Sequence, residues 1–170
     1  MAVAMDAQGP EKARPYLELA QATFQCAVDA DNVLGEVFNF KAIPNGVFID
    51  EEGIIRYIRL GGFDIRKPEF ARLAQLWAQG ASPEELVDAP PSDRDLSIKH
   101  PEALVSFRRG LELYRRGETE GALVEWRQGM ALEPDNYVIR KQIWAVEHPE
   151  RFYDGDIDTD WQRVQRELGQ

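Results

Sequence analysis

Hydrophobic and polar positions along residues 1–80 alternate between short apolar runs and segments with helical spacing. Four short apolar runs predict strands, at residues 1–5, 24–28, 47–50 and 54–59. Three runs with helical periodicity predict helices, at residues 11–22, 33–39 and 68–79. The pattern therefore predicts an α/β fold class for the first part of the chain.

Local signals refine the first two predicted helices. Pro15 lies inside the first and should shorten or bend it, since proline removes a helical hydrogen bond. Asp31 and Asn32 precede the second and predict its N-terminal cap. Val33 and Val37 then lie on one face of that helix.

Beyond residue 100 the spacing of apolar residues is helical throughout. Residues 81–100, which are rich in proline, predict a linker, and residues 101–170 predict a separate all-α domain. Further helices are predicted at residues 137–146 and 161–168, with Phe152 and Tyr153 as packing anchors between them. The domain prediction is therefore 1–80, a linker at 81–100, and 101–170.

Charge narrows the choice of partners. The chain has 170 residues and a net charge of −10, which both halves share. Nucleic acids and anionic membranes require a basic face, so neither is an expected partner. No apolar run has the length of a membrane span or signal segment, and the sequence as given predicts a cytoplasmic protein.

Metal and cofactor sites are not predicted. The acidic stretch at residues 154–160 resembles the start of a calcium loop, but Thr159 and Gln165 occupy the positions where glycine and glutamate are required. His100 and His148 are far apart and lack a second ligand at zinc spacing. The sequence therefore predicts no cofactor and no metal ion.

Cys26 is the only cysteine, so no internal disulfide can form. It lies between alternating apolar residues and precedes Asp29 and Asp31. Burial and nearby carboxylates both disfavour the reactive thiolate. Cys26 is therefore predicted to be a small core residue, and its action alone as a peroxidatic thiol is a minor hypothesis.

Residues 38–53, FNFKAIPNGVFIDEEG, carry a family resemblance. A helical run, an Ile43-Pro44 step, a short strand and an acidic turn resemble the C-terminal portion of thioredoxin-like redoxins, which include thiol–disulfide oxidoreductases and thiol peroxidases. The resemblance covers residues 1–80. It implies that the Ile43–Pro44 peptide bond is cis and that this loop faces the substrate.

The chain departs from this family in one respect. The strand and helix that carry the cysteine motif would lie upstream of Met1, so the resemblance places no catalytic residue in this chain. The missing strand would lie between the strands at residues 1–5 and 47–50, and its absence should leave apolar surface and strand edges uncovered. Two explanations stay open: a truncated start of a longer protein, or a partner chain that completes the sheet.

Residues 103–136 resemble a tetratricopeptide (TPR) repeat. Gly110, Ala122 and Gly129 supply the small residues that two closely packed helices need where they cross. Gly117 marks the turn between the helices, and Trp126 is the large aromatic residue of the second. A single repeat needs neighbours to bury its faces, so the later helices are predicted to cap it.

Two functions follow as expectations. In the first, the chain is an incomplete thioredoxin-like α/β domain followed by an all-α TPR-like domain, and belongs to a redoxin-family oxidoreductase or peroxidase whose cysteines lie elsewhere. In the second, the chain is a non-catalytic interaction module that holds a protein partner or forms a homodimer.

Overall fold

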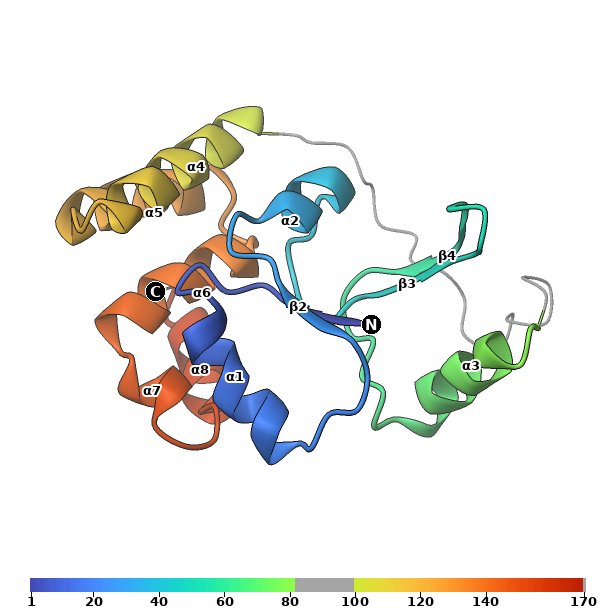
Figure 1. Cartoon of the computed structure of the whole chain (residues 1–170). Coiled ribbons are helices and arrows are strands. Elements are labelled where there is room, and N and C mark those ends of the chain that lie inside the picture. Colours follow the sequence, from blue (N-terminus) through green and yellow to red (C-terminus); the bar gives the residue numbers. More distant parts are fainter. Residues whose placement is uncertain (82–99, 170) are drawn as a thin grey trace. The chain divides into compact units, whose positions relative to one another are not determined.

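The computed structural model describes residues 1–81 and 100–169. These residues form eight helices and two two-stranded sheets (Figure 1). The chain divides into two compact units: Met1–Val33 with His100–Gln170, here called the helical unit, and Leu34–Lys99, here called the hairpin unit. This grouping differs from the predicted division at residue 80. The predicted linker falls mainly on residues 82–99, which lie outside the described residues.

The helical unit begins with a strand–helix–strand segment. Strand β1 (Ala2–Ala4) pairs in parallel with β2 (Cys26–Val28), and α1 (Pro10–Leu19) connects them. Helix α1 continues through Pro15 and ends at Leu19, so the expected shortening of this helix is slight. Both strands have only three residues, and each is paired along one edge within the described parts of the chain.

Helices α4 (Pro101–Arg115) and α5 (Thr119–Leu132) lie side by side (Figure 1). They approach so closely at Gly110 that a Cβ built there would overlap the indole ring of Trp126. Gly117, in the turn between them, has a φ of +79°, a conformation that favours glycine. The predicted roles of both glycines are therefore confirmed.

The last three helices are α6 (Tyr137–Glu147), α7 (Glu150–Tyr153) and α8 (Thr159–Glu167). The Asn136 side chain caps α6 by accepting from the backbone N–H groups of Val138 and Ile139. The Asp158 side chain caps α8 by accepting from the N–H of Trp161. The acidic stretch at residues 154–160 thus supplies a helix cap.

Two clusters of buried side chains form the core of the helical unit. The larger joins α4, α5 and α6 through Ala103, Phe107, Leu111, Ala122, Leu123, Trp126, Val138, Ile139 and Ile143. Met5 and Ala7, which follow β1, pack against this cluster. The smaller cluster contains Trp144 and Phe152, so Phe152 is a packing anchor as predicted. These contacts explain why the first 33 residues group with the helices.

The hairpin unit contains β3 (Gly46–Ile49), β4 (Ile55–Arg59) and α3 (Pro68–Ala78), and α2 (Val33–Phe38) begins at its boundary. Strands β3 and β4 are antiparallel, with Val47 opposite Ile58. One face of the hairpin packs on α3 through Phe48, Tyr57, Phe70 and Leu73. Besides most of α2, the unit therefore contains a hairpin with α3 over one of its faces.

The other face of the hairpin is apolar and less covered. Ile49 and Ile55 pair across the strands, and both are exposed. Val33 and Val37 of α2 are exposed as well, although apolar side chains at helical spacing favour a covered face. In the described residues no strand joins the β1–β2 pair to the β3–β4 pair.

Asp29 supplies the first contact at the start of α2. Its carboxylate accepts from the N–H of Val33 at 2.8 Å, in place of the predicted cap from Asp31 and Asn32. None of the helices in residues 1–81 and 100–169 has the length and apolar character that a membrane span requires.

Candidate functional site

The Ile43–Pro44 loop lies directly before β3 in the hairpin unit. Its peptide bond is cis, as the resemblance implies, and both side chains are exposed. An exposed isoleucine next to a proline presents apolar surface and a backbone of fixed shape to the solvent. Such a loop is suited to contact another polypeptide.

Hydrogen bonds hold this loop in place. The Asn45 amide donates to the carbonyl of Ala42 at 2.7 Å, and its side-chain oxygen accepts from the N–H of Gly61 at 2.7 Å. The carbonyl of Pro44 accepts from the N–H of Phe63 at 3.1 Å. The loop is therefore tied to the segment after β4 from both sides.

Gly46 permits a close packing contact beneath the loop. A Cβ at this position would overlap the ring of Phe63, which itself packs edge-on against Phe48. Phe63 thus joins the loop to the core of the hairpin unit. The supporting roles of Asn45, Gly46 and Phe63 were not predicted from the sequence, although Asn45 and Gly46 directly follow Pro44.

The acidic turn at the other end of the hairpin is also ordered by its own side chain. Asp50 accepts from the N–H groups of Glu52 and Ile54 and pairs with Arg56. The bond from the Ile54 N–H, together with the bonds from Arg56, lowers the pKa of the Asp50 carboxyl. The turn is therefore a structural closure of the hairpin.

Cys26 is the first residue of β2 and is half buried, outside the clusters of buried side chains, so the prediction of a core position is wrong. Its thiol lies 3.4 Å from the carbonyl oxygen of Phe24. Cys26 belongs to the helical unit, whereas Ile43 and Pro44 belong to the hairpin unit. Because Cys26 is the single cysteine of the chain, no second thiol of this chain can lie near it.

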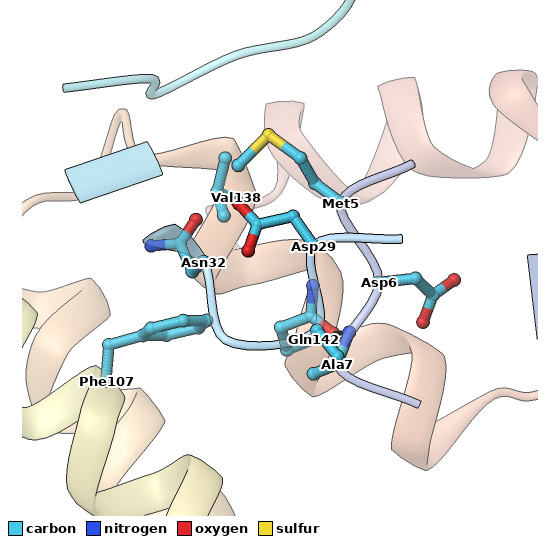
Figure 2. Close-up of a pocket in the computed structure, with 9 residues that line it drawn as sticks. Met5, Asp6, Ala7, Asp29, Asn32, Phe107, Val138 and Gln142 are labelled. Carbon is cyan, nitrogen blue, oxygen red and sulfur yellow. Dashed lines mark hydrogen bonds between the residues drawn. The ribbon is translucent and has the colours of Figure 1, made fainter. Parts of the chain in front are cut away.

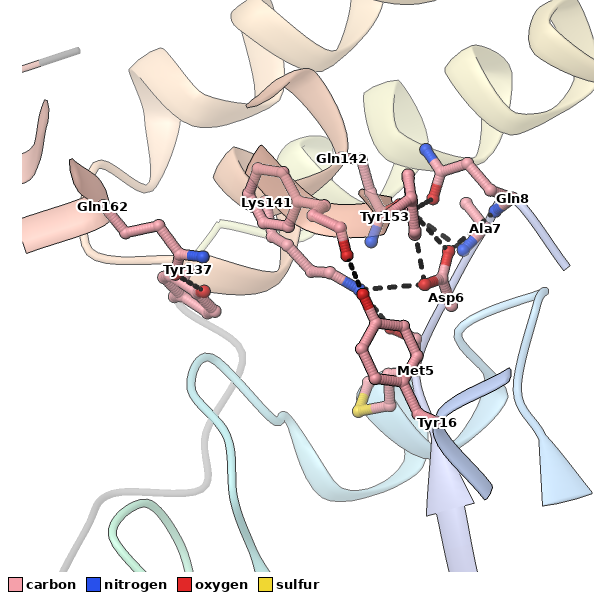
Figure 3. A network of polar contacts seen from close by, with 11 residues as sticks. Met5, Asp6, Ala7, Gln8, Tyr16, Tyr137, Lys141, Gln142, Tyr153 and Gln162 are labelled. Atoms are coloured by element: carbon pink, nitrogen blue, oxygen red, sulfur yellow. Dashed lines mark hydrogen bonds and ion pairs between the residues drawn. The ribbon is translucent and has the colours of Figure 1, made fainter. Parts of the chain in front are cut away.

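A buried polar network connects the loop after β1 to α6 and α7 in the helical unit (Figure 3). The Lys141 ammonium pairs with the Asp6 carboxylate at 3.2 Å and donates to the carbonyl of Met5 at 3.2 Å. The Tyr153 hydroxyl lies 2.9 Å from the side-chain oxygen of Gln8 and 3.2 Å from Asp6. Asp6 is therefore held by a cation and a phenol from a distant part of the chain.

Burial raises the pKa of two phenols in this region, which are protonated at neutral pH. Desolvation, and then the nearby Asp6 carboxylate, raises the pKa of the Tyr153 hydroxyl. The same two causes raise the pKa of Tyr16, whose hydroxyl donates to backbone carbonyl oxygens at Phe152 and Gly155. Neutral phenols act here as hydrogen-bond donors, and the network has the character of a structural clamp.

This network was not predictable from the pattern of residues along the chain. Asp6 stands at the end of a predicted strand, and its partners Lys141 and Tyr153 follow 135 and 147 residues later. Only the structure shows that the Asp6 carboxylate is buried and therefore needs these partners.

Residues that could hold a metal ion are not gathered in the described parts of the chain, where no three His, Cys, Asp or Glu side chains form a ligand group. His148 packs against Trp161, and its ring lies 3.7 Å from the Glu150 carboxylate. His100 immediately precedes α4.

Compared with known protein families, curated proteins and solved structures, the chain matches none. Two features of the chain itself bear on its function: the Ile43–Pro44 loop of the hairpin unit, and the helices that follow His100.

Proposed function

We propose that this chain is part of a thiol–disulfide oxidoreductase or thiol peroxidase of the thioredoxin-like redoxin class. The observation that carries the proposal is the exposed Ile43–Pro44 loop, which Asn45 and Phe63 hold at the start of β3. In this role the loop forms a wall against which the substrate lies. The reactive thiols come from polypeptide outside residues 1–170.

The order of elements supports this proposal. A strand, a helix, a parallel partner strand and a second helix precede the proline loop, and a hairpin and a third helix follow it. The apolar side chains of Ile49 and Ile55 are exposed, as expected for a sheet that further polypeptide covers. A thiol-bearing strand and helix would supply both the cover and the chemistry.

Cys26 plays no part in this chemistry. Dithiol exchange needs a thiolate and a second, resolving thiol. Cys26 is half buried, its thiol faces the carbonyl oxygen of Phe24, and the chain has no second cysteine that could resolve a mixed disulfide. Peroxide consumption by the native protein should be unchanged in Cys26→Ser, and a loss of that activity would assign the chemistry to Cys26 instead.

The test of the proposal is a disulfide-reductase and peroxidase assay on the protein purified from its native cell. Ile43→Glu should raise the KM for a protein substrate about tenfold with little effect on free-energy of unfolding, because the change adds charge to a contact surface. Ile54→Glu is the matched control, since Ile54 is a similarly exposed isoleucine in the acidic turn. An equal effect of both variants, or no activity in the unmodified protein, would contradict the proposal.

A second candidate function is a non-catalytic interaction module built on the TPR-like helices. The observation that favours it is exposed apolar surface on the α4–α5 pair, at Val105, Val124 and Leu132. Val124 and Leu132 are about two turns apart, so they lie toward the same side of α5. Val124→Glu should then abolish self-association or partner capture measured by light scattering, whereas a monomer without a recoverable partner would contradict this function.

A further inference from the structure

A small cavity lies at the carboxyl ends of β1 and β2 in the helical unit (Figure 2). The loops that follow the two strands form one side of it, and Phe107 and Val138 close the other. Its volume is about 10 Å³. A single water molecule requires roughly this volume, so the cavity admits one guest of that size and nothing larger.

The side chain of Asn32 indicates that a guest molecule or ion occupies this cavity. Its side chain is buried, with 7% of its surface exposed, and its oxygen has no hydrogen-bond partner. A buried carbonyl oxygen without a donor is costly, and native proteins satisfy nearly all such atoms. Asn32 also has a φ of +59°, a backbone conformation that asparagine tolerates better than most residues. The residue is thus held where its oxygen requires a donor.

Four polar side chains line the cavity: the carboxylates of Asp6 and Asp29 offer only acceptor oxygens, and Asn32 and Gln142 each carry an amide. The Asp29 carboxylate, which accepts from the N–H of Val33, and the Asp6 carboxylate, which pairs with Lys141, both belong to the lining. The side-chain oxygen of Gln142 lies 3.4 Å from the N–H of Ala7. A guest that carries positive charge or donates hydrogen bonds is therefore favoured over an anion or an apolar molecule.

We propose that the cavity binds one water-sized, electropositive guest, either a water molecule or a small monovalent cation, against the Asn32 side-chain oxygen. The guest joins the loop after β2 to the loop after β1 and to the helices that close the cavity. A divalent ion fits poorly, because the described residues provide no group of three His, Cys, Asp or Glu ligands here. The site stands independently of the proposed redox function.

Two measurements on the purified chain test this site. Magnetisation transfer from water to backbone amides detects a long-lived bound water near Asn32 and Ala7. Thermal unfolding in sodium, potassium and choline chloride at equal ionic strength detects a monovalent cation, because choline is too large for the cavity. A bound water gives the transfer signal and equal midpoints in the three salts, whereas a bound cation raises the midpoint in sodium or potassium in a saturable way.

Variants at Asn32 distinguish the loss of the bound guest from a change in backbone conformation. Asn32→Gly keeps the positive φ but removes the oxygen, and should abolish the water signal or the cation dependence and lower the midpoint by roughly 4 °C. Asn32→Asp keeps the shape and adds charge, so it should retain the water signal or increase the apparent cation affinity.

Asn39→Gly is the control, since Asn39 also has a positive φ, of +50°, but lies in the hairpin unit. It should leave the water signal and the cation dependence intact. The proposal is overturned if the unmodified chain shows neither signal, or if Asn32→Gly leaves the observed signal unchanged.

Discussion

The helical unit and the hairpin unit cover their central apolar side chains in different ways. In the helical unit α4, α5 and α6 enclose Trp126, whose ring is fully buried. In the hairpin unit α3 covers Phe48 and Tyr57 on one face, while Ile49 and Ile55 on the strands stay exposed. The first unit closes its own core, and the second has one covered face.

The difference follows from the elements themselves. Three helices joined by short turns can pack on one another without further polypeptide. A two-stranded hairpin is marginal alone and gains stability from additional strands or a second layer. The comparison therefore indicates that completion by further polypeptide matters for the hairpin unit far more than for the helical unit.

The largest expected effect is at the centre of the helical unit. Trp126→Ala should lower the free energy of unfolding by about 4 kcal/mol, because a fully buried ring and its hydrogen bond to the carbonyl of Phe107 are lost. Urea unfolding followed by circular dichroism measures this. Trp77→Ala in the hairpin unit is the control and should cost less, since Trp77 is only partly buried. A greater cost for Trp77→Ala would contradict the comparison.

The buried ion pair between Lys141 and Asp6 should give the next largest effect. Lys141→Met removes one partner and should cost about 3 kcal/mol of unfolding free energy, because the Asp6 carboxylate stays buried without its cation. Arg14→Met removes the exposed pair with Glu11 and should cost under about 1 kcal/mol. If Lys141→Met and Arg14→Met lower the free energy of urea unfolding equally, the Asp6–Lys141 pair does not act as a stabilising clamp.

A smaller effect tests the close contact of α4 with α5. Gly110→Ala should destabilise the helical unit by about 2 kcal/mol, since the new methyl group overlaps the buried Trp126 ring. Gly121→Ala is the matched control in α5, where the nearest Cβ contact would be Leu113 at 3.4 Å. It should stabilise by about 0.5 kcal/mol through helix propensity. The account of the α4–α5 contact fails if the two changes have the same sign.

The smallest effect concerns an exposed acid of the hairpin unit. Hydrogen bonds from the Arg66 guanidinium and backbone N–H lower the pKa of Asp64 to about 2. The stability that this contributes is fully present above the ordinary carboxyl pKa, about 4, and is lost as the pH falls through about 2. Arg66→Gln should raise the pKa of Asp64 toward about 4, as measured by NMR titration, and an unchanged pKa would exclude Arg66 as its cause.

Local features of both units were predictable from the sequence. The turn at Gly117, the close contact at Gly110 and the buried position of Trp126 agree with what the TPR resemblance implied, since adjacent helices need small residues where they cross. Phe107 and Leu111 are both buried in α4, where they lie about one turn apart on the same face of the helix. Periodicity carries this information because the contacts are local.

Contacts between distant segments were not predictable. The clamp of Asp6 by Lys141 and Tyr153, and the grouping of the first 33 residues with the helices, depend on residues far apart in the sequence. A single sequence contains no periodic signal for such pairs. The exposure of Val33 and Val37 also escaped prediction, since helical spacing indicates an apolar face but not what covers it.

The candidate site was predictable in part. The cis bond between Ile43 and Pro44 was expected from the family resemblance. The supports of this loop were not, because the Asn45 hydrogen bonds and the ring of Phe63 over Gly46 depend on the path of the chain after β4.

The most direct test of the proposed redox function is the number of reactive thiols in the protein from its native cell. Intact mass measured before and after alkylation gives this number. If the proposed redox function is correct, the protein is a species heavier than 19.4 kDa, or a stable complex, and takes up more than one alkyl group. A free 19.4 kDa species with one slowly reacting thiol would contradict it, and the TPR-like interaction module would then be the function to pursue.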